Sequence, residues 1–375
     1  MAMRVPDPAA ARQAFLTLAE AEGARIPTYA RLCRVIAAHP ELYELLLEAP
    51  TGERLPVLLL AALHDLVLRR PDLPLAAWYP SVTGRDPSPD PPDGALLDAV
   101  RTHRDELLSV LRDRQVQTNE VNRACAWWWG LSQLTREDRR PLHLLEVGAS
   151  AGLNLLLDAY AYRFDAPGGR VGQLVAGDAT SPVRLGTTVR GDLPDGLGAP
   201  LPPVAGRVGL DRRPVDPADP EDRRWLAACT WPEQRVRYER MESALALAAT
   251  RRPRVVKGDL VDDLERLVGE ATPGSHVVVL SSWVLVYAER DRRAAFGGVL
   301  AEAAAHTRRG GGRLSLLTLE DGKVLPWMDA PPLAGDADAD HVHASILAVT
   351  AFDHGEPEAT PLARCQAHLT WCEPL

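Results

Sequence analysis

Residues 142–160 combine the residue types of a small-molecule binding loop. From Leu142 to Val147 the segment is nearly continuously apolar, which is typical of a buried parallel strand. Gly148 and Gly152 follow, and glycine lets a backbone turn tightly and approach a ligand closely. A helix is predicted from about Gly152, with its free N–H groups facing the same ligand. The order of elements is therefore strand, nucleotide-binding loop and helix.

Glu146 indicates which ligand suits this loop. A carboxylate just before the first glycine repels phosphate and favours a cationic or hydroxyl-rich ligand. S-adenosylmethionine is such a ligand, because it carries an ammonium, a sulfonium and a ribose. The residues expected to form its site here are Glu146, Gly148, Ser150, Gly152 and Asn154.

The same loop permits a second chemistry. Its residues 148–152 also spell G-x-S-x-G, the nucleophile elbow of α/β-hydrolases. A serine hydrolase would need an acid and a histidine after Ser150, and Asp321 and His354 occur in that order. That fold should carry several strand-helix units before its elbow, whereas about 140 largely helical residues precede it here. Methyl transfer is the favoured interpretation; the alternatives are hydrolysis and noncatalytic or non-methylating S-adenosylmethionine binding.

A mostly parallel sheet is predicted to position the loop. Its five expected parallel strands are 142–147, 204–211, 254–264, 276–283 and 312–320. Strands that alternate with helices indicate an α/β fold with right-handed crossovers. Residues 344–352 and 363–371 are expected to close the sheet as an antiparallel hairpin, and the Gly- and Pro-rich residues 165–203 to form an inserted hairpin region.

The pattern Glu146-x-Gly148-x-x-x-Gly152 resembles the first motif of class I methyltransferases. Their Rossmann-like sheet is also a parallel series, into which one final strand inserts antiparallel. The resemblance implies that Asp211 binds the ribose hydroxyls and that residues 259–260, Asp259 and Leu260, lie beside the adenine. The segment between Gly152 and Asp211 is far longer than the roughly 20 residues usual in this class of motif. The resemblance therefore requires that residues 165–203 are an insertion.

Longer runs resemble a family of uncharacterised bacterial proteins known as a domain of unknown function. The runs are 117–121, 146–155, 209–211, 231–234 and 258–263. The similarity extends over nearly the whole chain. It implies a methyltransferase-like domain and identifies no substrate.

Residues 115–130 are a polar and Trp-rich segment that leads into the strand at 142–147. If this segment is helical, Asn119, Asn122 and Arg123 share one face, either as a solvated face or as a polar patch over the cofactor mouth. Methyl transfer is an in-line displacement that depends mainly on positioning, and it needs a base only for a hydroxyl or protonated amine acceptor. The catalytic candidates are Glu120 and Tyr287; the substrate-binding candidates are Asn119, Glu120, Arg123, Trp283 and Tyr287.

Composition favours work on a small molecule. The net charge of -9 and pI near 5.6 argue against nonspecific binding to nucleic acid or anionic membranes. The N-terminus has no apolar signal core and no run reaches the ~18 apolar residues of a membrane span, so a cytoplasmic protein is expected. We expect a helical domain at 1–140, on the lid or substrate side, and a Rossmann-like domain at 141–375. The oligomeric state stays open.

No metal site is predicted. Five cysteines without a C-x-x-C pattern suggest neither a disulfide framework nor zinc. An acidic, histidine-containing segment at 336–343 could coordinate a divalent cation. A solvated loop is the favoured interpretation, because the spacing fixes no coordination geometry. The segment's polar residues are Asp336, Asp338, Asp340, His341 and His343.

Overall fold

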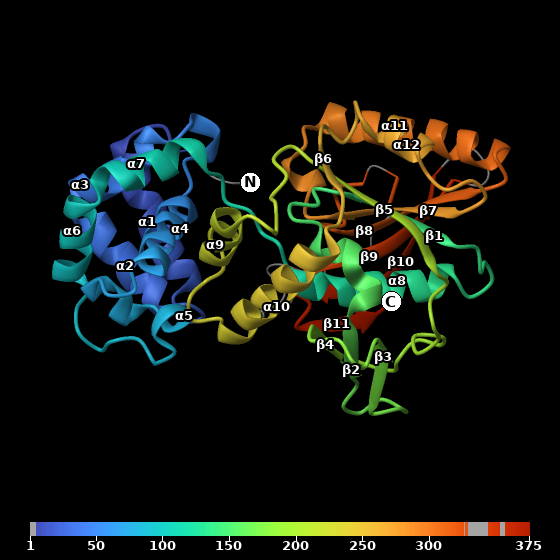
Figure 1. Ribbon diagram of the computed structural model, residues 1–375, viewed down its shortest axis with the longest axis horizontal. Helices are drawn as coiled ribbons and strands as arrows, with labels where there is room; N and C mark the ends of the chain where they lie inside the picture. Colours follow the sequence, from blue (N-terminus) through green and yellow to red (C-terminus); the bar gives the residue numbers. More distant parts are fainter. Residues whose placement is uncertain (1–4, 326, 329–343, 353–356) are drawn as a thin grey trace. The chain divides into compact units, whose positions relative to one another are not determined.

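The computed structural model describes residues 5–325, 327–328, 344–352 and 357–375 of the chain (Figure 1). These residues form two compact units. The first unit is Met1–Thr118 with Asp219–Glu242, and the second is Asn119–Ala218 with Ser243–Leu375. The division thus differs from a single cut between residues 140 and 141, because a later segment of the chain completes the first unit.

The first unit is helical. Its elements are α1 (Pro8–Glu22), α2 (Pro27–Ala38), α3 (Pro40–Tyr43), η1 (Glu44–Glu48), η2 (Thr51–Glu53), α4 (Pro56–Arg69), η3 (Pro74–Trp78), α5 (Pro80–Thr83), α6 (Asp93–Thr102), α7 (Arg104–Asp113) and α9 (Pro220–Ala228). Most of the α-helices begin with proline, which lacks an N–H and therefore suits a first helical turn. The almost uniformly apolar α4 is buried from Leu58 to Val67, as its sequence predicts. The next helix, α10 (Arg235–Arg251), begins in this unit and ends in the second.

The second unit is built on one mixed sheet. Its strands are β1 (Leu142–Val147), β2 (Ala161–Asp165), β3 (Gln173–Gly177), β4 (Arg184–Val189), β5 (Val204–Asp211), β6 (Val255–Lys257), β7 (His276–Ser282), β8 (Arg313–Glu320), β9 (Ala344–Ala351), β10 (Glu358–Gln366) and β11 (Trp371–Pro374). The order is β3-β2-β4-β11-β10-β9-β8-β7-β1-β5-β6. Among the described residues, six neighbouring pairs are parallel and four are antiparallel. The predicted α/β class with a mostly parallel sheet is confirmed.

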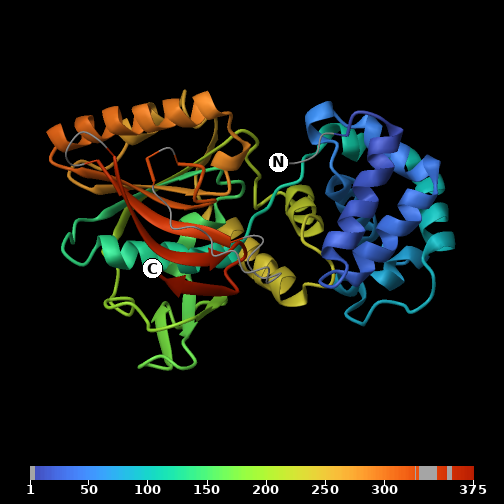
Figure 2. The ribbon, with the colours of Figure 1, turned by 180° about the vertical axis from the view of Figure 1, so that it is seen from behind.

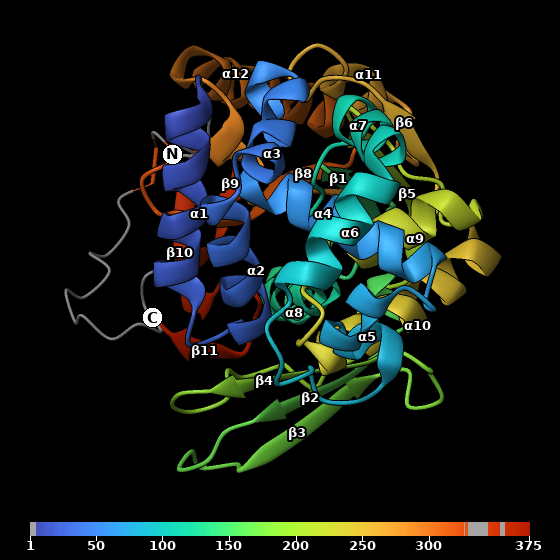
Figure 3. The same ribbon diagram turned by 90° about the vertical axis from the view of Figure 1, so that its left-hand side faces the viewer.

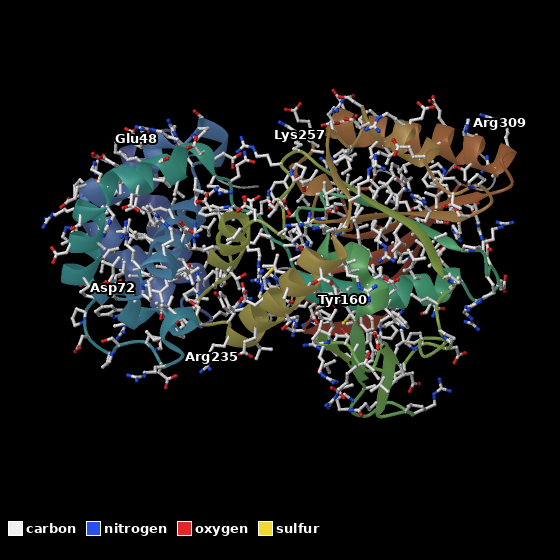
Figure 4. All side chains as sticks on the ribbon, in the orientation of Figure 1. Glu48, Asp72, Tyr160, Arg235, Lys257 and Arg309 are labelled. Carbon is white, nitrogen blue, oxygen red and sulfur yellow. The ribbon has the colours of Figure 1, made fainter. Side chains whose placement is uncertain are left out.

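The five predicted parallel strands lie together as β6-β5-β1-β7-β8. In chain order this is third, second, first, fourth and fifth, the arrangement of a doubly wound sheet. Figures 1 and 2 show α11 (Leu264–Gly269) and α12 (Arg290–Arg309) over one face and α8 (Ala124–Leu134) over the other. The apolar core beneath α11 and α12 includes Leu145, Val279 and Leu316. In Figure 4 side chains fill the layer between the sheet and α12, which ends at Arg309.

The two additions to the parallel strands differ from expectation. In the region at 165–203, β3 forms an antiparallel hairpin with β2, and β4 pairs in parallel with β2, so these strands extend the main sheet (Figure 3). The C-terminal hairpin forms as predicted, but its first strand, β9, pairs with β8, so no final strand is inserted into the parallel series. The reason is that β10 continues outward and pairs with β11, which in turn pairs parallel with β4.

Candidate functional site

The glycine loop follows β1 in a conformation that requires glycine. Gly148 and Gly152 both have φ of +69°. A Cβ on Gly148 would lie 2.2 Å from a methyl carbon of Val284, and one on Gly152 would lie 2.9 Å from a methyl carbon of Val255. Both backbone conformation and packing therefore exclude a side chain at these positions.

The helix predicted after the loop is not an α-helix. The segment Leu153–Ala159, η5, is a short 3-10 helix, and Leu156 inside it departs from helical geometry. It ends where the chain must enter β2, and the hydroxyl of Tyr160 donates to the carbonyl oxygen of Leu153 at 2.5 Å. A seven-residue irregular turn lacks the aligned N–H groups of an α-helix. Recognition at this loop therefore depends on its side chains.

Asp211 ends β5 and holds the loop. One carboxylate oxygen accepts a 2.7 Å bond from the backbone N–H of Ser150, and the other accepts from the N–H of Arg213 at 2.8 Å. Ser150 has a φ of +51°, a conformation that non-glycine residues rarely adopt. The charged acceptor compensates for that backbone strain. Asp211, which the resemblance implied despite the long spacing, thus lies directly at the glycine loop.

Asp259 follows β6 and is bound by two arginines. Its carboxylate accepts from Arg212 at 3.0 Å, from Arg292, and from the N–H of Val261 at 2.9 Å. Partial burial raises its pKa, but the Val261 N–H and the two guanidinium groups outweigh this effect and hold the pKa below its ordinary value. Asp259 is therefore charged, and its hydrogen bonds hold the turn that carries Leu260.

These loops border a cavity of about 210 Å³. Five predicted residues line it: Gly148, Asp211, Leu260, Trp283 and Tyr287. Five further residues complete the lining: Leu210, Arg212, Gly258, Val284 and Ala288. Tyr287 is 77% exposed, whereas the indole N–H of Trp283 bonds the hydroxyl of Ser345 at 2.9 Å. The remaining predicted residues do not belong to this lining: Glu146, Ser150, Gly152, Asn154, Asp259, Asn119, Glu120 and Arg123.

Glu146 is buried at the end of β1. One oxygen accepts from the amide of Asn154 at 3.1 Å, whereas the other, and the amide oxygen of Asn154, have no hydrogen-bond partner among the described residues. Burial raises the pKa of Glu146 to about 8, although the Asn154 amide and the Arg123 charge act in the opposite direction. Two unsatisfied acceptors in the protein interior are costly unless a donor reaches them.

The segment before α8 corrects the predicted helical face. Residues 114–120 are not helical, and the first turn is η4 (Val121–Arg123), because Glu120 caps it by accepting from the N–H of Asn122 at 3.1 Å. Asn119, Glu120, Asn122 and Arg123 are each only 2–6% exposed, so the solvated-face interpretation is wrong. These residues form a buried polar cluster.

Two members of that cluster connect distant strands. The Asn122 amide donates to the carbonyl oxygens of Gly186 and Leu369, both at 2.9 Å, which fastens η4 to β4 and to the turn after β10. The Arg123 guanidinium donates to the carbonyl oxygens of Ala367 and Ser282, both at 3.3 Å. Arg123 therefore joins the β10–β11 turn to the end of β7.

Glu320, at the end of β8, escaped the sequence analysis. One oxygen accepts from the hydroxyl of Ser281 and the N–H of Val284, both at 2.9 Å, and from the N–H of Leu285 at 3.2 Å. Burial raises its pKa, and these three donors act in the opposite direction. Glu320 thus anchors the loop that borders the cavity. The sequence signal was an acid ending the fifth parallel strand, the same signal that identified Asp211.

Two sequence hypotheses lie outside the described residues. One is the candidate cation segment at 336–343, and the other is His354 of the hydrolase interpretation. Within the described ranges, no group of three histidine, cysteine or acidic side chains could hold a metal ion. No helix in those ranges is both long and apolar enough to span a bilayer.

The chain belongs to a bacterial family. Residues 12–373 match the family described as "Uncharacterized protein conserved in bacteria (DUF2332)". No curated protein and no solved structure matches the chain significantly.

Proposed function

We propose that this member of the DUF2332 family is a methyltransferase that uses S-adenosylmethionine and acts on a small molecule. The observation that carries the proposal is the cavity at the carboxyl ends of the parallel strands, which joins Gly148, Asp211 and Leu260. In doubly wound sheets, ligands bind at this edge, where the chain order reverses. Here the reversal lies between β1 and β7.

Each recognition element suits a part of that ligand. The Asp211 carboxylate keeps lone pairs for ribose hydroxyls, because each oxygen accepts one N–H and can accept another donor. Leu260 offers apolar contact to adenine. Glu146 and Asn154 lie outside the cavity lining, on either side of the glycine loop, and their unsatisfied oxygens suit an ammonium. The cavity is smaller than the ~300 Å³ of a typical ligand pocket, so it suits adenosine better than the complete cofactor.

When bound, the cofactor supplies an electrophilic methyl group. The residues of the chain then align the acceptor and exclude water, which can contribute on the order of 7–11 kcal/mol. Trp283 and Tyr287 border the cavity and are suited to contact the acceptor. A noncatalytic S-adenosylmethionine-binding protein would share the binding elements and lack the transfer.

Calorimetry with S-adenosylmethionine and S-adenosylhomocysteine tests the proposal. We expect saturable binding of both, together with thermal stabilisation of the protein. Absence of heat and of stabilisation at millimolar ligand would reject it. An assay of methyl transfer would then distinguish an enzyme from a binding protein. It uses radiolabelled cofactor and a panel of phenol, amine, thiol and carboxylate acceptors.

The positive φ of Ser150 is one observation in favour of hydrolysis, since a nucleophile elbow is also strained. An irregular 3-10 turn follows it, however, where the elbow opens an α-helix. Asp321 accepts from the N–H of Lys323 at 3.0 Å in a turn after β8. We therefore do not propose hydrolysis, and labelling of Ser150 with a fluorophosphonate probe tests it directly.

A further inference from the structure

A buried carboxylate orients a histidine in the second unit. One oxygen of Glu120 lies 3.0 Å from Nδ1 of His368, and the other accepts from the N–H of Asn122 at 3.1 Å. The Glu120 side chain is 1% exposed and that of His368 is 25% exposed. The backbone N–H of His368 also donates to the side chain of Gln366 at 2.5 Å. Contacts to the ring and to the backbone N–H therefore both hold His368 in place.

The contact assigns a tautomer to the ring. A carboxylate in contact with Nδ1 favours the tautomer that carries its hydrogen on Nδ1, which leaves Nε2 as the basic nitrogen. Glu120 also stabilises the imidazolium that forms when Nε2 takes a proton. A carboxylate that orients a histidine is the arrangement that general bases of this kind use.

The pair lies at the same edge of the sheet as the cavity. His368 is in the turn after β10, one residue beyond Ala367, which Arg123 links to Ser282 at the end of β7. A second link runs from the indole of Trp283, a cavity residue, to Ser345 of β9. Ser345 pairs with residue 365 of β10. Two independent contacts thus connect the His368 turn to the cavity wall.

We propose that His368 is the general base of the methyl transfer and that Glu120 is its positioning residue. The inference rests on the proposed function and narrows the acceptor to a hydroxyl or protonated amine, the groups that must lose a proton. A protonated amine first gives its proton to Nε2, whereas a hydroxyl gives up its proton to Nε2 as it attacks. In both cases a lone pair of the acceptor forms the bond to the methyl carbon, while the carbon–sulfur bond breaks and its electron pair stays on sulfur, so that S-adenosylhomocysteine is the second product.

The test compares the two cofactor forms by NMR in the full chain. S-adenosylmethionine and S-adenosylhomocysteine differ by a methyl group and one positive charge. A base within hydrogen-bond reach of the acceptor lies roughly 6 Å from the sulfur, where that charge lowers an imidazole pKa by about half a unit even at the dielectric of water. Histidine-selective ¹⁵N labelling would follow the titration of His368 in both complexes.

We expect a pKa for His368 at least about half a unit lower in the S-adenosylmethionine complex. His143 is the control, since it lies near the amino end of β1, at the opposite edge, and its pKa should be equal in both complexes. Saturable binding with identical His368 titrations would overturn the inference and leave the proposed function standing. Failure of both ligands to bind would reject the two together.

A Glu120→Gln variant tests the positioning residue. We expect unchanged affinity for S-adenosylhomocysteine, since both Glu120 oxygens are already engaged by Asn122 and His368, and a lower pKa for His368 because the negative charge is lost. An unchanged pKa for His368 would show that Glu120 does not set the ring's basicity, and would remove its assigned role.

Discussion

The ionisation of Glu146 should couple ligand binding to pH. Burial raises its pKa to about 8, so the free protein holds this carboxyl mostly protonated at pH 7. An ammonium ligand favours the ionised form. Only about a tenth of the free protein is ionised at pH 7 and about nine tenths at pH 9, so the contribution of Glu146 to affinity should rise roughly tenfold across this range.

The groups around Glu146 set the size of this effect. The Asn154 amide and the Arg123 charge favour ionisation, and the Asp211 charge opposes it. A Glu146→Gln variant keeps the shape and cannot ionise. The ratio of the two proteins' affinities for S-adenosylhomocysteine therefore isolates Glu146, because titration of the ligand's own amine affects both equally.

Calorimetry at pH 6, 7, 8 and 9, in buffers of different ionisation enthalpy, measures the ratio and the protons exchanged. The wild type should release about 0.9 proton per ligand at pH 7 through Glu146, and the Gln variant should lack this component. An affinity ratio that is constant between pH 7 and pH 9 would refute the assignment of the ammonium to Glu146.

Three further predictions concern the same edge of the sheet. In the free protein, the free energy of unfolding of the wild type should fall as the pH rises from the ordinary carboxyl value of 4.5 to about 8, at a slope that approaches about 1.4 kcal/mol per pH unit, because only the unfolded state releases the Glu146 proton there. The Glu146→Gln variant should lack this fall, and urea unfolding of both proteins at pH 5 and pH 8 measures the difference. Asp211→Ala should weaken S-adenosylhomocysteine binding about ten- to a hundredfold, since charged hydrogen bonds contribute roughly 1.5–3 kcal/mol each; a folded variant with unchanged affinity would contradict the ribose assignment. Ser150 should resist fluorophosphonate labelling, as the Ser150→Ala variant must, and stoichiometric labelling of the wild type would establish hydrolysis instead.

The sequence predicted β1, β7 and β8 because these strands are almost entirely buried and are therefore largely apolar. It located Asp211 despite the long insertion, because an acid that ends a strand is a local signal. The burial of Glu120 and Arg123 could not be predicted, because the same sequence of polar residues at helical spacing is compatible with a solvated face and with a buried cluster. His368 carries no motif at all, and its neighbour Glu120 is remote in the chain.

Helix and strand boundaries depended on tertiary contacts in the same way. The helix expected after Gly152 became a short 3-10 turn because the chain must enter β2 directly afterwards. The Gly- and Pro-rich region at 165–203 was predicted to contain a hairpin, and β3 and β4 lie within it. The strand β4 pairs with β11, which is distant in the sequence, and a local sequence pattern cannot predict such a pairing.

That pairing has a consequence for synthesis on the ribosome. Thr188 and Val189 of β4 pair with Trp371 and Cys372, which are translated long after them. Until those residues emerge, β4 leaves one row of backbone groups without its strand partner. Such open edges recruit other strands and form slowly when the partner is distant in sequence. The nascent chain must therefore wait for β11 before the continuous sheet can close over this junction.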